Sequence, residues 1–358
     1  MNAIIDDRKR ALGKVRVVPL AQAVGTVLAH DITEIRPGEF KGRAFRKGHI
    51  IREEDIGPLR RLGKESLFIL DLTSEDIHED EAAMALAAAL CGDGAQVAGE
   101  PKEGKANLAA SRSGLLKIDK EALLALNMMG EVMCATLHSN TLVKRGQVVA
   151  GTRAVPLVLK RRVVEQAVSL LKGKKIIEVK ELRRPRAGVV ITGNEVHCGR
   201  IKDAFAPVIR RKLEALGGEI AGLYYAPDDA EIIRQRLVLL LKAGADLLIA
   251  TGGMSVDPDD VTRFAIRNLA ENITYGSAAL PGTMFLVAYI TPPDEGGVVP
   301  ILGIPACSMY NKTTVFDLIL PRILAGERIG RTELAELGHG GLCLECKECR
   351  YPVCPFGK

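Results

Sequence analysis

The segment 246–262 constrains the fold of this chain more than any other part of the sequence. It begins with a short apolar run that ends abruptly at Thr251, and the pair Gly252-Gly253 follows at once. An apolar run of this length, bounded by glycines, is typical of a buried parallel strand. The residues after such a strand lie at the carboxyl edge of the sheet, where open α/β folds bind ligands. The sequence therefore predicts a binding loop at this edge.

The composition of this loop indicates what kind of ligand it binds. The two glycines let the backbone approach a ligand closely and present amide N–H groups to anions. Three carboxylates follow within four positions, at Asp257, Asp259 and Asp260. Because carboxylates repel a bare phosphate, the loop favours a divalent cation or ligand hydroxyls between its acidic groups and an anionic ligand. The alternative is a tight turn followed by the acidic start of a helix.

A second loop of the same kind lies upstream and extends the pattern. The short apolar run 187–191 leads into Thr-Gly-Asn-Glu at 192–195, and a helix is expected to begin at Pro207, since proline is favoured in the first turn. A strand over 219–225, with Asp228 and Asp229 after its end, and an apolar helix over 230–243 then connect to the strand before Thr251. This β-α-β-α-β order predicts a parallel sheet with three polar loops converging on one edge.

Taken together, these loops resemble the molybdopterin-binding fold shared by molybdopterin molybdenumtransferases, molybdopterin adenylyltransferases and competence/damage-inducible proteins. The matching pieces are Thr-Gly-Asn-Glu-Val at 192–196, Asp228-Asp229, Thr-Gly-Gly-Met-Ser at 251–255, Asp260 with Thr262, Leu-Pro-Gly at 280–282 and Leu-Gly-Ile-Pro at 302–305. The resemblance covers about residues 186–326. It implies an α/β domain with three α/β/α layers around a parallel sheet.

The resemblance also implies which residues form the site. The Gly-rich loops would hold the phosphate or diphosphate of molybdopterin or of its adenylylated form, and Asp260 and Glu195 would act in catalysis near Mg²⁺ or the dithiolene end. The implied cofactor-binding residues are Thr192, Gly193, Asn194, Glu195, Asp228, Asp229, Thr251, Gly252, Gly253, Met254, Ser255, Asp257, Asp260, Thr262, Pro281, Gly282 and Pro305. The implied function is metal insertion into molybdopterin, with molybdate or tungstate as the second substrate.

Residues 1–183 are predicted to form an α+β region that resembles the N-terminal half of the molybdenumtransferases. The opening segment 18–29 and the piece 48–70, in which a helix leads into a strand, carry this likeness. Members of that branch often dimerise through this half, so a homodimer is expected. Two other features depart from the molybdenumtransferases: the chain has no Asp-Gly-Tyr-Ala element, and Pro-Asp-Asp-Val-Thr at 258–262 is closer to the competence-protein pattern. Two alternatives therefore remain open, namely a Mg²⁺-dependent hydrolase of nucleotide diphosphates and a non-catalytic carrier or sensor of the cofactor.

The C-terminal segment 327–358 carries a cysteine motif. Cys343, Cys346, Cys349 and Cys354 lie within twelve residues, and Pro355 follows the last of them. The C-x₂-C-x₂-C run resembles the iron–sulfur ligands of bacterial ferredoxins, although the last spacing is four residues instead of three. Structural zinc sites usually separate two such pairs more widely, yet four thiolates also suit zinc. The segment predicts a [4Fe–4S] cluster or Zn²⁺, with a redox or disulfide tail as the remaining alternative.

The composition indicates the cell compartment and the classes of partner to expect. Half of the 8 cysteines fall in the C-terminal motif, which favours a reducing compartment over a disulfide scaffold. The first ten residues mix acidic and basic side chains where a signal peptide would be apolar, and no apolar run is long enough to span a membrane, so a cytoplasmic protein is expected. A net charge of +5, no Trp and 4% aromatic residues disfavour a nucleic-acid partner. The expected partners are a pterin phosphate, the metal oxyanion and an acceptor molybdoenzyme.

Overall fold

The structure, a computed structural model, describes residues 15–36, 40–70, 73–102, 104–255, 257, 260–292 and 297–358. The chain forms two compact units. The first comprises Met1–Leu137 and Val143–Val179, and the second comprises His138–Leu142 and Lys180–Lys358. Among the described residues, no helix combines the length and the apolarity needed to cross a bilayer.

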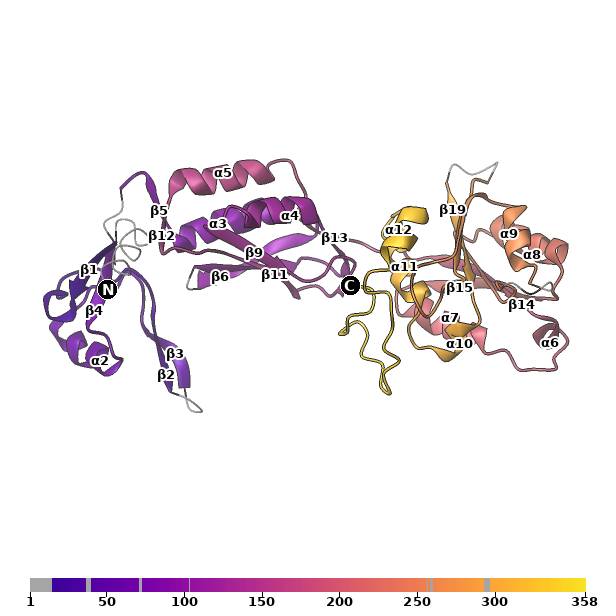
Figure 1. The fold of residues 1–358 in the computed structure, drawn as a ribbon, viewed down its shortest axis with the longest axis horizontal. Coiled ribbons are helices and arrows are strands. Elements are labelled where there is room, and N and C mark those ends of the chain that lie inside the picture. Colours follow the sequence, from indigo (N-terminus) through magenta and orange to yellow (C-terminus); the bar gives the residue numbers. More distant parts are fainter. Residues whose placement is uncertain are drawn as a thin grey trace. The chain divides into compact units, whose positions relative to one another are not determined.

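The first unit is an α+β assembly of several small sheets. Its N-terminal part pairs β1 with β4 and β2 with β3, both antiparallel, and its larger part holds the antiparallel sheet β6-β7-β11-β9. The elements are β1 Val15–Pro19, a 3₁₀ turn Leu20–Gln22, β2 Ile32–Arg36, β3 Phe40–Phe45, a 3₁₀ turn Glu53–Asp55, α2 Ile56–Arg61, β4 Ser66–Leu70, β5 Asp76–His78, α3 Glu79–Leu90, β6 Ala95–Lys102, β7 Lys105–Ala110, β8 Gly114–Ile118, α4 Lys120–Asn127, β9 Val132–Thr136, β10 Leu142–Val143, β11 Val148–Ala154, β12 Val158–Lys160, α5 Arg161–Leu171 and β13 Ile177–Lys180. Figure 1 shows α3, α4 and α5 gathered on one side of the β6-β7-β11-β9 sheet.

Helix α3 is the centre of this unit. Its alanine-rich sequence places Ala82, Ala83, Leu86, Ala87 and Leu90 in the core, where small side chains allow close packing against the sheet. Its first turn contains three acidic residues beginning at Glu79, which the helix dipole favours. His78 lies at the N-cap of the helix, where its side chain accepts the Asp80 N–H.

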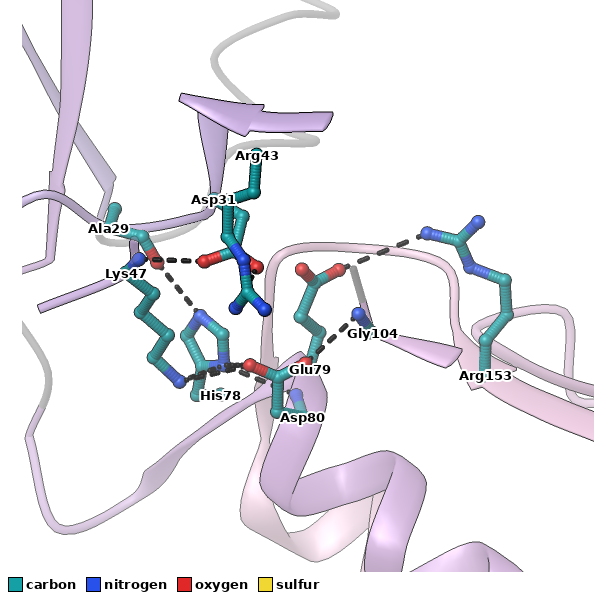
Figure 2. A network of polar contacts seen from close by, with 9 residues as sticks. All are labelled: Ala29, Asp31, Arg43, Lys47, His78, Glu79, Asp80, Gly104 and Arg153. Carbon is teal, nitrogen blue, oxygen red and sulfur yellow. Dashed lines mark hydrogen bonds and ion pairs between the residues drawn. The ribbon is translucent and has the colours of Figure 1, made fainter. Parts of the chain in front are cut away.

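His78 is the centre of a polar network at the start of α3 (Figure 2). Its Nε2 lies 2.9 Å from the carbonyl oxygen of Ala29, while its Nδ1 accepts from the Lys47 Nζ at 2.6 Å and from the Asp80 backbone N–H at 3.1 Å. With Nδ1 as the acceptor, the proton of a neutral ring lies on Nε2 and points at Ala29. The network therefore binds the uncharged imidazole.

We expect the first unit to lose stability on mild acidification through His78. Burial, and then the neighbouring Lys47 charge, lower the pKa of His78 from its ordinary value of 6.5. The unfolded chain therefore binds this proton at a higher pH than the folded chain, so the free energy of unfolding falls as the pH drops below 6.5. Denaturant titrations between pH 7 and pH 5 measure the effect. His78→Gln, which keeps a donor for Ala29 but cannot titrate, should show a flatter pH dependence, and an equal slope would contradict the prediction.

The second unit is built on a six-stranded sheet in the order β15-β14-β16-β19-β18-β17. The first four strands are parallel, and β18 and β17 add an antiparallel edge. The elements are β14 Arg186–Thr192, α6 Asn194–His197, α7 Phe205–Glu214, β15 Glu219–Ala226, α8 Ala230–Lys242, β16 Leu247–Thr251, α9 Thr262–Arg267, β17 Glu271–Tyr275, β18 Leu286–Ile290, β19 Val299–Ile304, α10 Cys307–Tyr310, α11 Val315–Leu324 and α12 Arg331–Glu336. The predicted α/β class is confirmed, with a mixed sheet in place of an all-parallel one.

Helices cover both faces of this sheet, as the three-layer prediction requires. Along β14, Val189 and Ile191 enter a core with α7 and α11, whereas Val190 enters a core with α8 and α9. Every residue of β16 is buried, which explains its continuous apolar run. Helix α7 begins at Phe205, two residues before the predicted start, because the Asp203 carboxylate, just before the N-cap residue Ala204, accepts the first-turn N–H groups of Phe205 at 2.7 Å and Ala206 at 3.1 Å.

The C-terminal segment belongs to the second unit. Phe356 is buried in the same core as α11, and Tyr351 packs against that core. The Cys343 N–H donates to the Leu280 carbonyl at 2.9 Å, and the Leu280 N–H donates to the Gly341 carbonyl at 2.7 Å. Backbone pairing and an aromatic anchor therefore fix the cysteine motif onto the domain.

Candidate functional site

The loops after β14 and β16 meet through one buried hydroxyl. The side chain of Thr192 donates to the Thr251 carbonyl at 2.7 Å, and its oxygen lies 3.0 Å from the Thr262 hydroxyl. Thr192 and Thr262 are almost completely buried, so these hydrogen bonds form in a low-dielectric environment where they hold the loops firmly. The predicted convergence of the two loops is thus present, and both threonine side chains position the loops.

A reciprocal pair joins the loops after β14 and β15. The Asn194 N–H donates to Asp228 Oδ2 at 3.0 Å, and the Asp228 N–H lies 3.3 Å from Asn194 Oδ1. This pairing places α6 at the sheet edge with the Glu195 side chain exposed. Asp229 has a different role, since its carboxylate accepts the N–H groups of Glu231 and Ile232 at 2.9 Å and caps α8.

The glycine pair after β16 adopts a conformation that other residues avoid. Gly252 has φ +79° and Gly253 has φ +57°, both in the left-handed region. A Cβ on Gly252 would lie 2.7 Å from the Thr192 hydroxyl, and a Cβ on Gly253 would lie 2.5 Å from the Thr262 hydroxyl. Both positions therefore require glycine for backbone conformation and for space.

Three buried polar atoms at this edge have no hydrogen-bond partner among the described residues. They are Thr251 Oγ1, Asp260 Oδ2 and Arg263 Nε. A buried polar atom without a partner costs about 1–3 kcal/mol, so such atoms are rare away from sites that a ligand, ion or water completes. Two acceptor-capable oxygens and one cationic donor at the end of a Gly-Gly loop fit a ligand that carries both an anionic group and a bound cation.

The remaining predicted residues divide between the surface and the core. Asp257 is exposed, and its carbonyl accepts the Asp260 N–H at 3.0 Å, which turns the loop toward α9. Met254 is 2% exposed and packs on Gly303, so its side chain belongs to the core. Gly282 and Pro305 are also buried, Ser255, Pro281 and Gly193 are half-buried, and Asp259 lies outside the described residues.

Arg263 is a site residue that the sequence analysis missed. Its guanidinium carbon lies 4.8 Å from the Phe264 ring centroid and 5.7 Å from that of Tyr275. Tyr275 in turn donates to the Met254 carbonyl at 2.5 Å, which ties the glycine loop to the edge strand β17. A single arginine early in a helix carries no periodic pattern, so only its nearness to Asp260 in the sequence could have indicated this position.

The four thiols of the C-terminal motif line a single cavity of about 550 Å³. Cys343 and Cys354 are half-buried, whereas Cys346 and Cys349 are exposed, and all eight cysteines of the chain are free. The Thr313 hydroxyl, 3.3 Å from Cys349 Sγ, lowers the pKa of that thiol. Within the described part of the chain, no three His, Cys, Asp or Glu side chains are close enough together to hold one metal ion.

Two family models match parts of the chain, one of them within the second unit. Residues 188–325 match the family model described as a probable molybdopterin binding domain, and residues 17–71 match a domain of unknown function. The resemblance predicted from the sequence is confirmed for residues 188–325, which match this family model.

Curated relatives share a shorter stretch with the chain. A CinA-like protein of Mycobacterium avium (strain 104) is 40% identical over 77 residues, which is 22% of this chain and 18% of that protein. A CinA-like protein of Mycobacterium tuberculosis (strain ATCC 25618 / H37Rv) is 39% identical over 77 residues, with the same coverage. The chain thus matches 18% of the length of these relatives.

Several solved structures align with part of the chain. The tungsten cofactor synthesizing protein MoaB from Pyrococcus furiosus aligns at 18% identity and TM-score 0.35, covering 41% of this chain and 99% of that one. The protein CinA from Thermoplasma acidophilum, described as having unknown function, aligns at 16% identity and TM-score 0.30, covering 35% of this chain and 90% of that one.

Proposed function

We propose that the second unit binds molybdopterin, or its adenylylated form, at the loops after β14, β15 and β16, and that the protein acts in metal insertion. The observation that carries this proposal is the group of unpartnered buried atoms of Thr251, Asp260 and Arg263 beside the glycine pair. The family match over residues 188–325 supports the pterin as the ligand class. The unpartnered Arg263 Nε is a donor and requires an anionic group on the ligand. The unpartnered Asp260 Oδ2 is an acceptor and requires a cation or a hydrogen-bond donor.

Each loop has a defined task in this mechanism. Gly252 and Gly253 let a phosphate or diphosphate approach the backbone, because no side chain stands between them and the ligand. Arg263 donates to a phosphate oxygen through its buried Nε. Asp260 and Asp257, which lie in one loop, and Glu195 in the loop after β14 would supply carboxylate oxygens for Mg²⁺, and the cation would supply charge stabilisation during cleavage of a diphosphate bond. Thr192 and Thr262 hold these groups in register through their mutual hydrogen bond.

The proposal also covers the metal source, the oligomeric state, the acceptor of the product and the cysteine motif. Molybdate or tungstate is the metal source, a homodimer forms through the first unit, and an acceptor molybdoenzyme takes the product. The four thiols of the C-terminal motif hold a [4Fe–4S] cluster or Zn²⁺. A cytoplasmic location is part of the proposal, because half of the eight cysteines fall in one motif and do not form a disulfide scaffold pattern in the sequence.

The proposal predicts that the full-length protein binds molybdopterin with micromolar or tighter affinity and requires Mg²⁺ for turnover. With adenylylated molybdopterin, molybdate and Mg²⁺, AMP should appear in step with metal incorporation, and chelation of Mg²⁺ should stop it. Isothermal titration measures binding, and chromatography of AMP measures turnover. Failure to bind any pterin phosphate would refute the proposal.

A second candidate function is Mg²⁺-dependent hydrolysis of a nucleotide diphosphate, which the CinA-like relatives and the Pro-Asp-Asp-Val-Thr run favour. Release of AMP from ADP-ribose, in the absence of pterin and molybdate, would support it. A third candidate, the non-catalytic carrier or sensor, fits the missing Asp-Gly-Tyr-Ala element. Tight pterin binding with no AMP release from either compound would select the carrier.

A further inference from the structure

The cavity around the C-terminal cysteines has the composition of a built site. All four thiols line it, together with the cationic side chains of Lys312, Lys347 and Arg350 and the carboxylate of Glu345. Thiolates are soft ligands that select zinc, copper(I) and iron–sulfur clusters. The three cations outnumber the one carboxylate, so the lining offsets part of the net negative charge that such a centre carries.

The size of the cavity and the order of the cysteines in the sequence indicate which metal centre fits. A tetrahedral zinc site has Zn–S bonds of about 2.3 Å, which draws its thiolates to within about 3.8 Å of one another. The four thiols line a cavity of about 550 Å³, which has room for more than a single ion, and their C-x₂-C-x₂-C run resembles the iron–sulfur ligands of bacterial ferredoxins. In a [4Fe–4S] cluster each thiolate binds a different iron, so the four sulfurs stay farther apart around a larger inorganic core.

The cavity also adjoins two loops of the proposed pterin site. One wall, Asn311–Thr313, follows β19 and Pro305 through the short helix α10, and the Asn311 N–H donates back to the Cys307 carbonyl at 3.0 Å. The opposite side is the strand-like pairing of Leu342 with Leu280, directly before Pro281. Both walls are therefore continuous with loops that the sequence assigned to the pterin.

We propose that Cys343, Cys346, Cys349 and Cys354 bind one [4Fe–4S] cluster, and that the cluster braces the Leu280–Gly282 and Pro305–Thr313 loops. The evidence for cluster binding is the cysteine-lined cavity and does not depend on the proposed function. The bracing of loops beside a bound pterin rests on the proposed function. The half-buried Cys343 and Cys354 are fixed by the core, and the exposed Cys346 and Cys349 close over the cluster.

Anaerobic reconstitution of the full chain with iron and sulfide tests cluster binding. We expect about four iron and four sulfide per chain, with the broad visible absorption of such clusters. The double variant Cys346→Ser/Cys349→Ser should lose more than three quarters of the iron, while Cys198→Ser, a matched change at an exposed cysteine outside the motif, should keep it. Because the two replaced thiols are exposed, the variant should fold, which circular dichroism checks. One zinc per chain without iron uptake, or equal iron in the double variant, would overturn the inference.

Hydrogen exchange tests the bracing of the loops. The N–H groups of Leu280 and Cys343 form the backbone pairing between the domain and the motif, so their exchange should slow severalfold when the cluster is bound. Unchanged exchange in the iron-loaded protein would overturn this part. A pterin titration on the same samples separates the two proposals: pterin binding without iron uptake removes only the cluster, and iron uptake without pterin binding removes only the proposed function.

Discussion

Asp260→Asn is expected to lower Mg²⁺-dependent AMP release by about 10²–10³-fold, because a cation at this position supplies several kcal/mol of charge stabilisation. Asn keeps the size of the side chain but provides a single neutral oxygen, which is a weak ligand for Mg²⁺. Pterin binding measured without Mg²⁺ should change far less than binding measured with it. The rate of AMP release and the affinity for pterin, each measured with and without Mg²⁺, test this prediction.

The stability of this variant separates a functional role from a structural one. Asp260 Oδ2 is buried and has no hydrogen-bond partner among the described residues, so this oxygen is desolvated in the free protein without a compensating hydrogen bond. The free energy of unfolding should therefore stay the same or rise in Asp260→Asn. Asp203→Asn, which keeps a capping oxygen for α7, serves as the control and should alter neither stability nor turnover. A marked loss of stability in Asp260→Asn would show that the carboxylate supports the fold.

The second unit was largely predictable from its sequence because its elements have strong local patterns. β14 and β16 each contain a continuous apolar run, at 187–191 and 247–250, and α8 starts directly after the Asp229 cap, so the β-α-β-α-β order could be predicted from the residues. The convergence of the polar loops then followed from the geometry of parallel strands. The hydrogen bond from Thr192 to Thr251 confirms it.

Other parts of the site depend on tertiary contacts that local patterns do not encode. Met254 was assigned to the ligand with the rest of its loop, yet its side chain is buried because Gly303 on the neighbouring strand leaves room for it. Asp228 and Asp229 are adjacent in sequence, but one pairs with Asn194 and the other caps a helix. Arg263 became a candidate only when the structure showed its Nε buried, with no hydrogen-bond partner in the described part of the chain.

Gly252→Ala is expected to weaken pterin binding by more than a hundredfold and to lower the free energy of unfolding by about 2–4 kcal/mol. Left-handed backbone at a residue with a Cβ costs about 1–3 kcal/mol. The new Cβ would also lie 2.7 Å from the Thr192 hydroxyl and 2.8 Å from the Thr192 carbonyl oxygen, so the loops must separate. That movement breaks the hydrogen bonds of Thr192, each worth about 1 kcal/mol, and displaces the backbone that receives the phosphate.

Alanine substitutions at two other glycines serve as controls that separate backbone strain from the contact with Thr192. Gly326 has φ +84° with no atom within 4 Å of a Cβ, so Gly326→Ala reports the backbone strain alone. Gly297 has neither a left-handed φ nor a close neighbour, so Gly297→Ala should be silent. Unfolding by denaturant and pterin titration on all three variants give the comparison. If Gly252→Ala costs no more than Gly326→Ala and binds pterin normally, then the contact between Gly252 and Thr192 does not hold the ligand loop, and the site must lie elsewhere on the domain.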